Sequence, residues 1–154
     1  MRRRKAIEVA QETRGIYLPW IANHYGQRYP AVSVRYPDSS AMTVDPNMKT
    51  NKWPRVAVME GDQVDIALSW SESEYGNSQR TQIPVVNMAN EGRPGGDWES
   101  GLIAPEECLA RRSNLVHALR NPSQNGMHDC PVAHYPIPPK GGMYSPWIGT
   151  RIVT

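Results

Sequence analysis

One stretch constrains this chain more than any other, because an apolar run, a glycine-rich loop and a helix opening follow one another within residues 83–115. The apolar run at residues 83–90 is β-branched and ends in two asparagines, so we predict a short strand. The loop after it carries four glycines, Gly92, Gly95, Gly96 and Gly101. Pro105 then opens a predicted helix, since its missing N–H would be unpaired in the first turn anyway. This order is typical of a phosphate site, because bare backbone N–H groups can face an anion.

The helix after Pro105 is predicted to run to about Arg120, before Asn121 and Pro122. Glu106 and Glu107 fall in its first turn, where the helix dipole favours negative charge. Its apolar face consists of Cys108, Leu109, Leu115, Val116 and Leu119. Arg112 falls inside this stripe. A buried cation there needs an acid or a bound anion as partner, whereas a packed stem with its head in solvent needs neither.

The order and spacing of these residues resemble the microbial-type poly(ADP-ribose) glycohydrolases, a family with the macrodomain fold. Four sub-motifs carry the resemblance, namely Asn87-Met88-Ala89-Asn90, Pro94-Gly95-Gly96-Asp97, Pro105-Glu106-Glu107 and Arg112-Ser113-Asn114-Leu115. Two positions depart from the family pattern: Asp97 stands where the family has a third glycine, and Pro105 stands where it has glutamine. The resemblance implies an α/β fold, a macrodomain-like three-layer sandwich.

The resemblance covers nearly all of the chain, but the chain covers only about the first half of the family's domain. We therefore expect residues 1–154 to form a single, incomplete domain, apparently truncated. A half-domain exposes sheet edges and apolar faces, so we also expect possible self-association through that face.

The resemblance implies that Glu107 is the catalytic acid, with Glu106 beside it as a second candidate. Cleavage of a ribose O-glycosidic bond passes through an oxocarbenium-like state. A carboxylic acid must protonate the leaving oxygen, and the resulting carboxylate then activates water. To hold a proton near neutral pH, Glu107 needs a pKa raised by desolvation against the effect of the helix dipole. The structural alternative is an ordinary Pro-Glu-Glu helix opening, with Glu107 and Arg111 as an i,i+4 pair.

The glycine loop is the candidate ADP-ribose-binding segment. Gly95 and Gly96 let the backbone approach a pyrophosphate closely. A carboxylate on Asp97 about 4 Å from a phosphate would cost on the order of 4 kcal/mol at an effective dielectric of 20. The side chain escapes that cost if it points to solvent or pairs with Arg93 or Arg111.

The remaining candidate binding residues each have a plain structural alternative. By resemblance, Asn87 and Asn90 lie near the distal ribose, but asparagine also suits turns. Trp98 either stacks on substrate or packs in the core. Pro105 keeps the helix start but lacks the side-chain amide of the family's glutamine.

Three functions remain open from the sequence. The first is an enzyme that hydrolyses ribose O-glycosidic bonds of (poly)ADP-ribose, the second is a binding module for ADP-ribose, and the third is an inactive truncated relative. The implied partner is ADP-ribose or an ADP-ribosylated protein, and no cofactor is expected.

Composition and charge narrow the classes of protein to which this chain can belong. The 154 residues suit one domain, and 17 Lys+Arg against 15 Asp+Glu give a net charge of +2, so no nucleic-acid partner is expected. No apolar run approaches the roughly 18 residues of a membrane helix. Two cysteines give no disulfide framework, so an intracellular protein, cytoplasmic or nuclear, is expected. His128, Cys130 and His134 match no common zinc spacing and are one ligand short, so no metal is expected.

The rest of the chain gives local predictions only. Residues 3–14 are predicted to form a helix that stops at Gly15. Strands are predicted at residues 31–36 and 55–60, and residues 64–70 fit a strand or a helix equally well. Residues 143–154 resemble the next strand of the family, so the resemblance implies a strand there. Loops are predicted at residues 37–54, 71–82 and 121–142.

Overall fold

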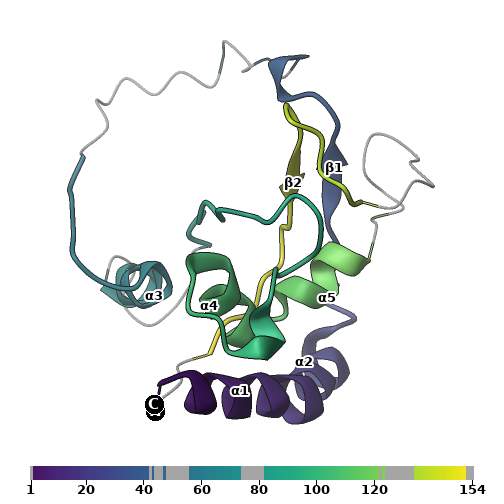
Figure 1. Cartoon of the computed structure of the whole chain (residues 1–154). Coiled ribbons are helices and arrows are strands. Elements are labelled where there is room, and N and C mark those ends of the chain that lie inside the picture. The colour runs from purple at the N-terminus through teal and green to yellow at the C-terminus, as the bar shows by residue number, and fades with distance from the viewer. Residues whose placement is uncertain are drawn as a thin grey trace. The chain divides into compact units, whose positions relative to one another are not determined.

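The computed structural model describes residues 2–41, 43, 47, 56–73, 82–121, 123 and 134–151. These residues fall into two compact units, Met1–Ser39 with Asn87–Thr154, and Ser40–Val86. The described part of the chain contains helices and a small antiparallel sheet, joined by long irregular segments (Figure 1). The predicted α/β character is therefore confirmed. None of the helices in these ranges has the length and apolar run that a membrane crossing needs.

The first unit begins with a long helical run. It consists of α1 (Arg2–Glu12), a π-helical segment (Thr13–Tyr17) and α2 (Leu18–Tyr25). The predicted helix is confirmed, but the predicted stop at Gly15 is wrong. A glycine inside a helix costs only about 1 kcal/mol, and here Thr13 is fully buried on the same run, so packing holds the helix together through the glycine.

The single helix predicted between residues 105 and 120 is two helices, α4 (Pro105–Arg111) and α5 (Leu115–Arg120). Ser113 separates them. Its hydroxyl donates to the carbonyl of Leu109 at 2.7 Å and accepts from the N–H of Leu115 at 3.2 Å. One side chain thus satisfies backbone groups at the end of α4 and the start of α5, which stabilises the break.

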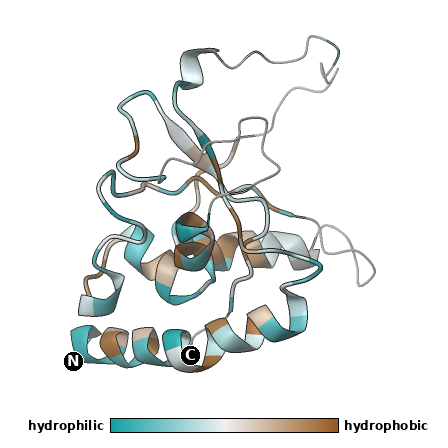
Figure 2. Cartoon of the chain, turned by 90° about the vertical axis from the view of Figure 1, so that its right-hand side faces the viewer, coloured by the Kyte–Doolittle hydropathy of each residue, from teal (hydrophilic) through white to brown (hydrophobic). Residues whose placement is uncertain are grey.

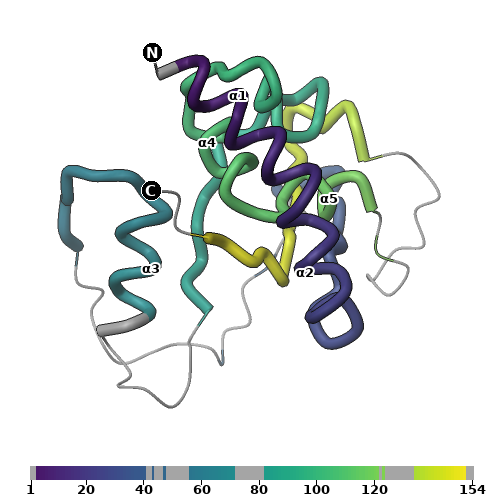
Figure 3. Tube along the Cα trace, turned by 90° about the horizontal axis from the view of Figure 1, so that it is seen from below, coloured from purple at the N-terminus to yellow at the C-terminus, as the bar shows by residue number. Residues whose placement is uncertain are grey.

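The core of the first unit lies where α1 crosses α4 (Figure 3). A buried cluster joins α1, α4, α5 and the 3-10 turn Trp98–Ser100. Its members are Ala10, Trp98, Ala110 and Val116. Apolar residues follow α4 and α5 on the coloured ribbon (Figure 2). This packing fixes the start of α4, where both glutamates lie.

The sheet pairs β1 (Val34–Tyr36) with β2 (Gly142–Tyr144) in antiparallel register, with Val34 opposite Tyr144. The strands predicted at residues 31–36 and 143–154 are thus confirmed in part. In the second, Thr150 makes only an isolated bridge with Ser113, and residues 152–154 lie outside the described ranges.

The strand predicted at residues 83–90 is wrong, because this segment is extended without a ladder partner among the described residues. Val86 is 81% exposed. A β-branched run forms a strand only where a neighbouring strand accepts and donates its backbone hydrogen bonds.

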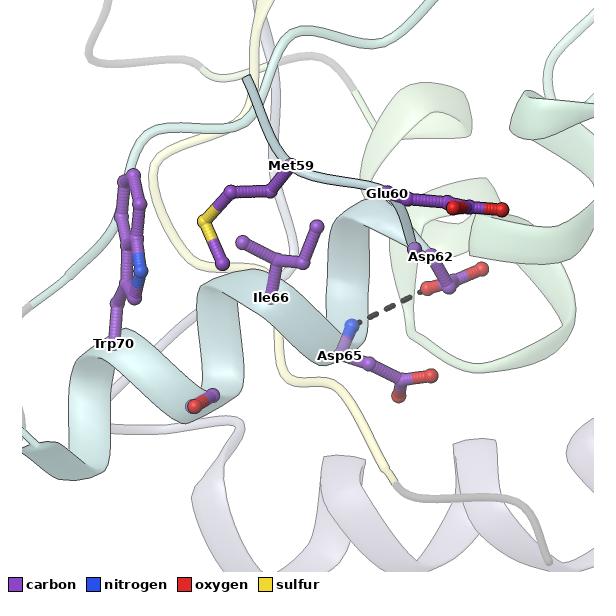
Figure 4. Close-up of a pocket in the computed structure, with 8 residues that line it drawn as sticks. Met59, Glu60, Asp62, Asp65, Ile66 and Trp70 are labelled. Carbon is purple, nitrogen blue, oxygen red and sulfur yellow. Dashed lines mark hydrogen bonds between the residues drawn. The ribbon is translucent and has the colours of Figure 1, made fainter. Parts of the chain in front are cut away.

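The second unit contains α3 (Gln63–Ser73), which resolves residues 64–70 as helix. The Asp62 carboxylate caps it by accepting from the N–H groups of Val64 at 2.8 Å and Asp65 at 3.2 Å. Met59, Ile66 and Trp70 point into a shallow pocket beside this cap (Figure 4).

The strand predicted at residues 55–60 is also wrong for residues 56–60, which are extended and exposed, and Val58 is 99% exposed. No described strand pairs with them. In the predicted loops, Ser39–Ala41 forms a 3-10 turn, residues 71–73 extend α3, and residues 74–81 lie outside the described ranges.

Candidate active site

Glu106 is the residue on which the glycine loop converges. It lies in the first turn of α4, and 2% of it is exposed. Its Oε2 accepts from the backbone N–H of Asn90 at 2.6 Å, and its Oε1 accepts from the N–H of Gly95 at 3.2 Å. The side-chain amide of Asn87 donates to Oε1 at 3.4 Å. The carboxylate therefore holds the first part of the loop, from Asn90 to Gly95, against α4.

Glu107 lies beside it and is also buried, with 7% exposed. Its Oε1 accepts from the backbone N–H of Asp97 at 3.2 Å. A Cβ atom at Gly96 would lie 2.3 Å from the same oxygen, and Gly96 has a positive φ of 54°. Only glycine allows this close approach of the loop to the Glu107 carboxylate.

Gly95 has an equivalent constraint on the other side of the loop. Its φ is 76°, and a Cβ there would lie 2.5 Å from Cγ2 of Val116 in α5. The two glycines predicted as a close-approach pair therefore bring the loop against a catalytic candidate and against the core.

The pKa of the Glu106 carboxyl is raised above its usual value of 4.5. Burial is the main cause, and the negative charge of Glu107 adds to it. Hydrogen bonds from Asn90, Asn87 and Gly95 act in the opposite direction. The carboxyl groups of Glu106 and Glu107 are thus both buried and close enough for the charge of one to affect the pKa of the other.

Asp97, the first departure from the family pattern, is paired with Arg93. The shortest distance between the guanidinium and the carboxylate is 2.8 Å, and both side chains are about half-exposed. Of the possibilities predicted for Asp97, pairing with Arg93 is the one that the structure contains. The negative charge at this position is therefore accompanied by a positive one.

The buried cation is Arg111 rather than Arg112. Arg111 is 4% exposed and donates to the carbonyl oxygens of Trp98 at 2.9 Å and Leu102 at 2.8 Å. Arg112 is only partly buried because α4 ends at residue 111, which turns the next residue off the helical stripe. Backbone carbonyls thus accept from the buried guanidinium and tie α4 to the loop after Trp98.

Asn90 and Trp98 take the structural roles that were the alternatives to substrate binding. The Asn90 side-chain oxygen accepts from the N–H groups of Gly92 at 2.9 Å and Arg93 at 3.0 Å, which forms a turn. Trp98 is 4% exposed and belongs to the core cluster. Pro105 is exposed at the first position of α4.

Sequence reasoning missed Tyr135. Its hydroxyl is shielded from solvent and has no hydrogen-bond partner among the described residues. Burial and then the charge of Glu106 raise its pKa, so the phenol lies within electrostatic reach of the site. The N–H of Ile137 donates to the carbonyl of Glu91 at 2.9 Å, which ties this segment to the glycine loop. The sequence offers little signal beyond a tyrosine in a proline-rich connection.

No described set of three or more His, Cys, Asp or Glu side chains is placed to hold a metal ion. Of the three residues considered as metal ligands in the sequence, His134 is buried, and its Nδ1 lies 3.0 Å from the carbonyl oxygen of Leu119. His128 and Cys130 lie outside the described residues.

Comparison with known families agrees with the motifs. The family model of the microbial-type PARG catalytic domain matches residues 4–149, a range that contains both glutamates and the whole glycine loop. Neither the curated proteins nor the solved structures gave a match. The resemblance inferred from the four sub-motifs is confirmed, and the chain belongs to the family of microbial-type poly(ADP-ribose) glycohydrolase (PARG) catalytic domains.

Proposed function

We propose that this protein hydrolyses ribose O-glycosidic bonds of (poly)ADP-ribose, with Glu107 as the acid and base. The observation that carries the proposal is the contact of the Glu107 carboxylate with the glycine loop, where it accepts from the Asp97 N–H and lies against Gly96. In a member of this family, that contact brings a buried carboxyl to the segment expected to bind the substrate. We further propose that the residues belong to a single domain with the three-layer macrodomain-like sandwich.

The proposed reaction uses one carboxyl twice. Protonated Glu107 gives its proton to the leaving oxygen as the bond from that oxygen to the ribose C1 breaks. The Glu107 carboxylate then takes a proton from water as the water oxygen bonds to C1, which restores the acid. The products are free ADP-ribose and the hydroxyl of the leaving group.

Glu106 has a different role in this proposal. Its two oxygens already accept three hydrogen bonds from Asn87, Asn90 and Gly95. A group so occupied is suited to hold the loop rather than to exchange protons with substrate. We therefore assign proton transfer to Glu107 and loop positioning to Glu106.

The test compares the wild-type protein with Glu107→Gln. Titration calorimetry measures ADP-ribose binding, and release of ADP-ribose from poly(ADP-ribose) measures turnover. The variant is expected to lose about 10²- to 10⁴-fold in turnover and to retain binding. Glu99→Gln is the matched control, because Glu99 belongs to the same segment and its side chain is 53% exposed. Undiminished turnover in Glu107→Gln would exclude the assignment.

A second candidate function is recognition of ADP-ribose without cleavage. Pro105 favours it, because proline lacks the side-chain amide that the family has at this position. The same experiment separates the two functions: wild-type binding without turnover identifies a binding module. Absence of both identifies an inactive relative.

A further inference from the structure

We propose that Tyr135 is a substrate-contacting residue of the Glu106–Glu107 site, and that its hydroxyl hydrogen-bonds a sugar hydroxyl of the bound ligand. This inference rests on the proposed function. Tyr135 lies outside the four sub-motifs, 28 positions after Glu107.

Two buried polar atoms have no partner among the described residues: the side-chain oxygen of Asn87, whose amide nitrogen contacts Glu106, and the Tyr135 hydroxyl. Both are shielded from solvent. A buried polar group without a hydrogen bond costs about 1–3 kcal/mol. Orphaned groups of this kind are rare in folded proteins and call for a bound partner or a functional role.

Asn87 is hydrogen-bonded to Glu106, and Tyr135 lies within electrostatic range of the same carboxylate. The amide nitrogen of Asn87 donates to Glu106 Oε1 at 3.4 Å, which leaves the amide oxygen free to accept. Tyr135 is near enough for the charge of Glu106 to raise its pKa, so the phenol remains a neutral hydrogen-bond donor at physiological pH.

The segment that carries Tyr135 is fixed at two points. His134 contacts the carbonyl of Leu119 in α5 through Nδ1 at 3.0 Å, and Ile137 donates to Glu91 in the glycine loop at 2.9 Å. Tyr135 lies between these two anchors, so the position of its hydroxyl is coupled to the position of the loop.

The chemistry of the two atoms selects the ligand group. Asn87 offers an acceptor, whereas the phenol both donates and accepts. An alcohol also donates one hydrogen bond and accepts others, so a ligand hydroxyl is able to pair with either atom. A phosphate oxygen, which only accepts, leaves the Asn87 oxygen unpaired. The ribose of ADP-ribose supplies such hydroxyls.

Tyr135→Phe gives two opposite expectations. In the unliganded protein, removal of an orphaned hydroxyl leaves the melting temperature unchanged or raises it by about 2–4 °C. The affinity for ADP-ribose falls roughly three- to tenfold, the value of one neutral hydrogen bond. ADP, which lacks the distal ribose, binds wild type and variant equally. Tyr144→Phe is the matched control, because Tyr144 is 56% exposed, and it changes none of these quantities.

Three results would overturn the inference while leaving the proposed function in place. These are a lower melting temperature of Tyr135→Phe, unchanged ADP-ribose affinity, or an equal loss of affinity for ADP and ADP-ribose. A wild-type protein that binds neither ligand would overturn the proposed function and this inference together. The combination of retained stability with a loss confined to ADP-ribose supports the assignment.

Discussion

The backbone N–H of Asp97 donates to the carboxylate of Glu107 at 3.2 Å, while the Asp97 side chain is paired with Arg93. Asp97 has a φ of −99°, which any residue adopts without strain. The position therefore contributes its main chain to the candidate acid and directs its charge to an arginine. This relationship explains how the loop accommodates a carboxylate where the family has glycine.

Replacement of Gly96 tests the close approach to Glu107. A methyl group at this position would lie 2.3 Å from Glu107 Oε1, on a backbone with a φ of 54°. Gly96→Ala is expected to displace the carboxylate and to reduce turnover at least tenfold, since catalysis depends on position at the ångström scale. Gly142→Ala is the matched control, because nothing lies within 4 Å of its added Cβ. Equal turnover of the two variants would contradict the role of the Gly96 contact.

Removal of the carboxylate at residue 97 tests its effect on a bound phosphate. We expect Asp97→Gly to bind ADP-ribose more tightly than wild type. The gain should be smaller than the roughly thousandfold cost of an unpaired carboxylate 4 Å from a phosphate, because Arg93 accompanies the charge. Arg93→Gln should weaken binding, since it leaves Asp97 unpaired. Calorimetric titration measures both, and unchanged affinity in Asp97→Gly would mean that the side chain does not sense the ligand.

The raised pKa of Glu106 predicts a pH dependence of stability. Between pH 4.5 and the folded-state pKa, the folded protein holds this proton more firmly than the unfolded chain does. The contribution of Glu106 to stability is therefore greatest at low pH and falls as pH rises through that window. Glu106→Gln has no proton to lose, so the melting temperature of wild type should fall relative to the variant as pH rises above 4.5. The opposite slope would indicate a lowered pKa at Glu106.

We expect Arg111 to contribute more to the free energy of unfolding than the other basic residues near the site do. Arg111→Met leaves the carbonyls of Trp98 and Leu102 without their charged donor, and the free energy of unfolding should fall by about 2–4 kcal/mol. Arg120→Met is the control, because Arg120 is exposed at the end of α5, and its effect should stay within about 0.5 kcal/mol. Urea denaturation of the two variants measures the difference. Similar midpoints would show that the two carbonyls find other donors.

The sequence predicted the parts of the site that depend on local backbone chemistry. Pro105 marked the start of α4 correctly, because its fixed φ and missing N–H suit a first helical position. Pairing of Asp97 with Arg93 was one of the expected outcomes, because a carboxylate near a phosphate needs a cation or solvent to offset its charge. Gly95 and Gly96 were expected to allow close approach, and both have positive φ values with no room for a side chain.

Features that depend on distant partners were not predicted. The runs at residues 56–60 and 83–90 have strand-like composition, but no described strand pairs with either of them. The helix predicted through Ser113 is broken because its hydroxyl bonds to Leu109 and Leu115, an alternative that periodicity does not reveal. The segment that carries Tyr135 is tied to the loop by the Ile137–Glu91 hydrogen bond, which joins residues far apart in the chain.

The hydrogen bonds of Glu106 also predict which glutamate a relative of this chain would keep if it lost hydrolysis. Because this side chain holds the N–H groups of Asn90 and Gly95, a descendant that had lost hydrolysis but kept ligand recognition would still need it. Selection for an intact loop and selection for turnover would then act on neighbouring glutamates independently. Loss of Glu107 with Glu106 retained is therefore the change expected in a relative that binds ADP-ribose without cleaving it.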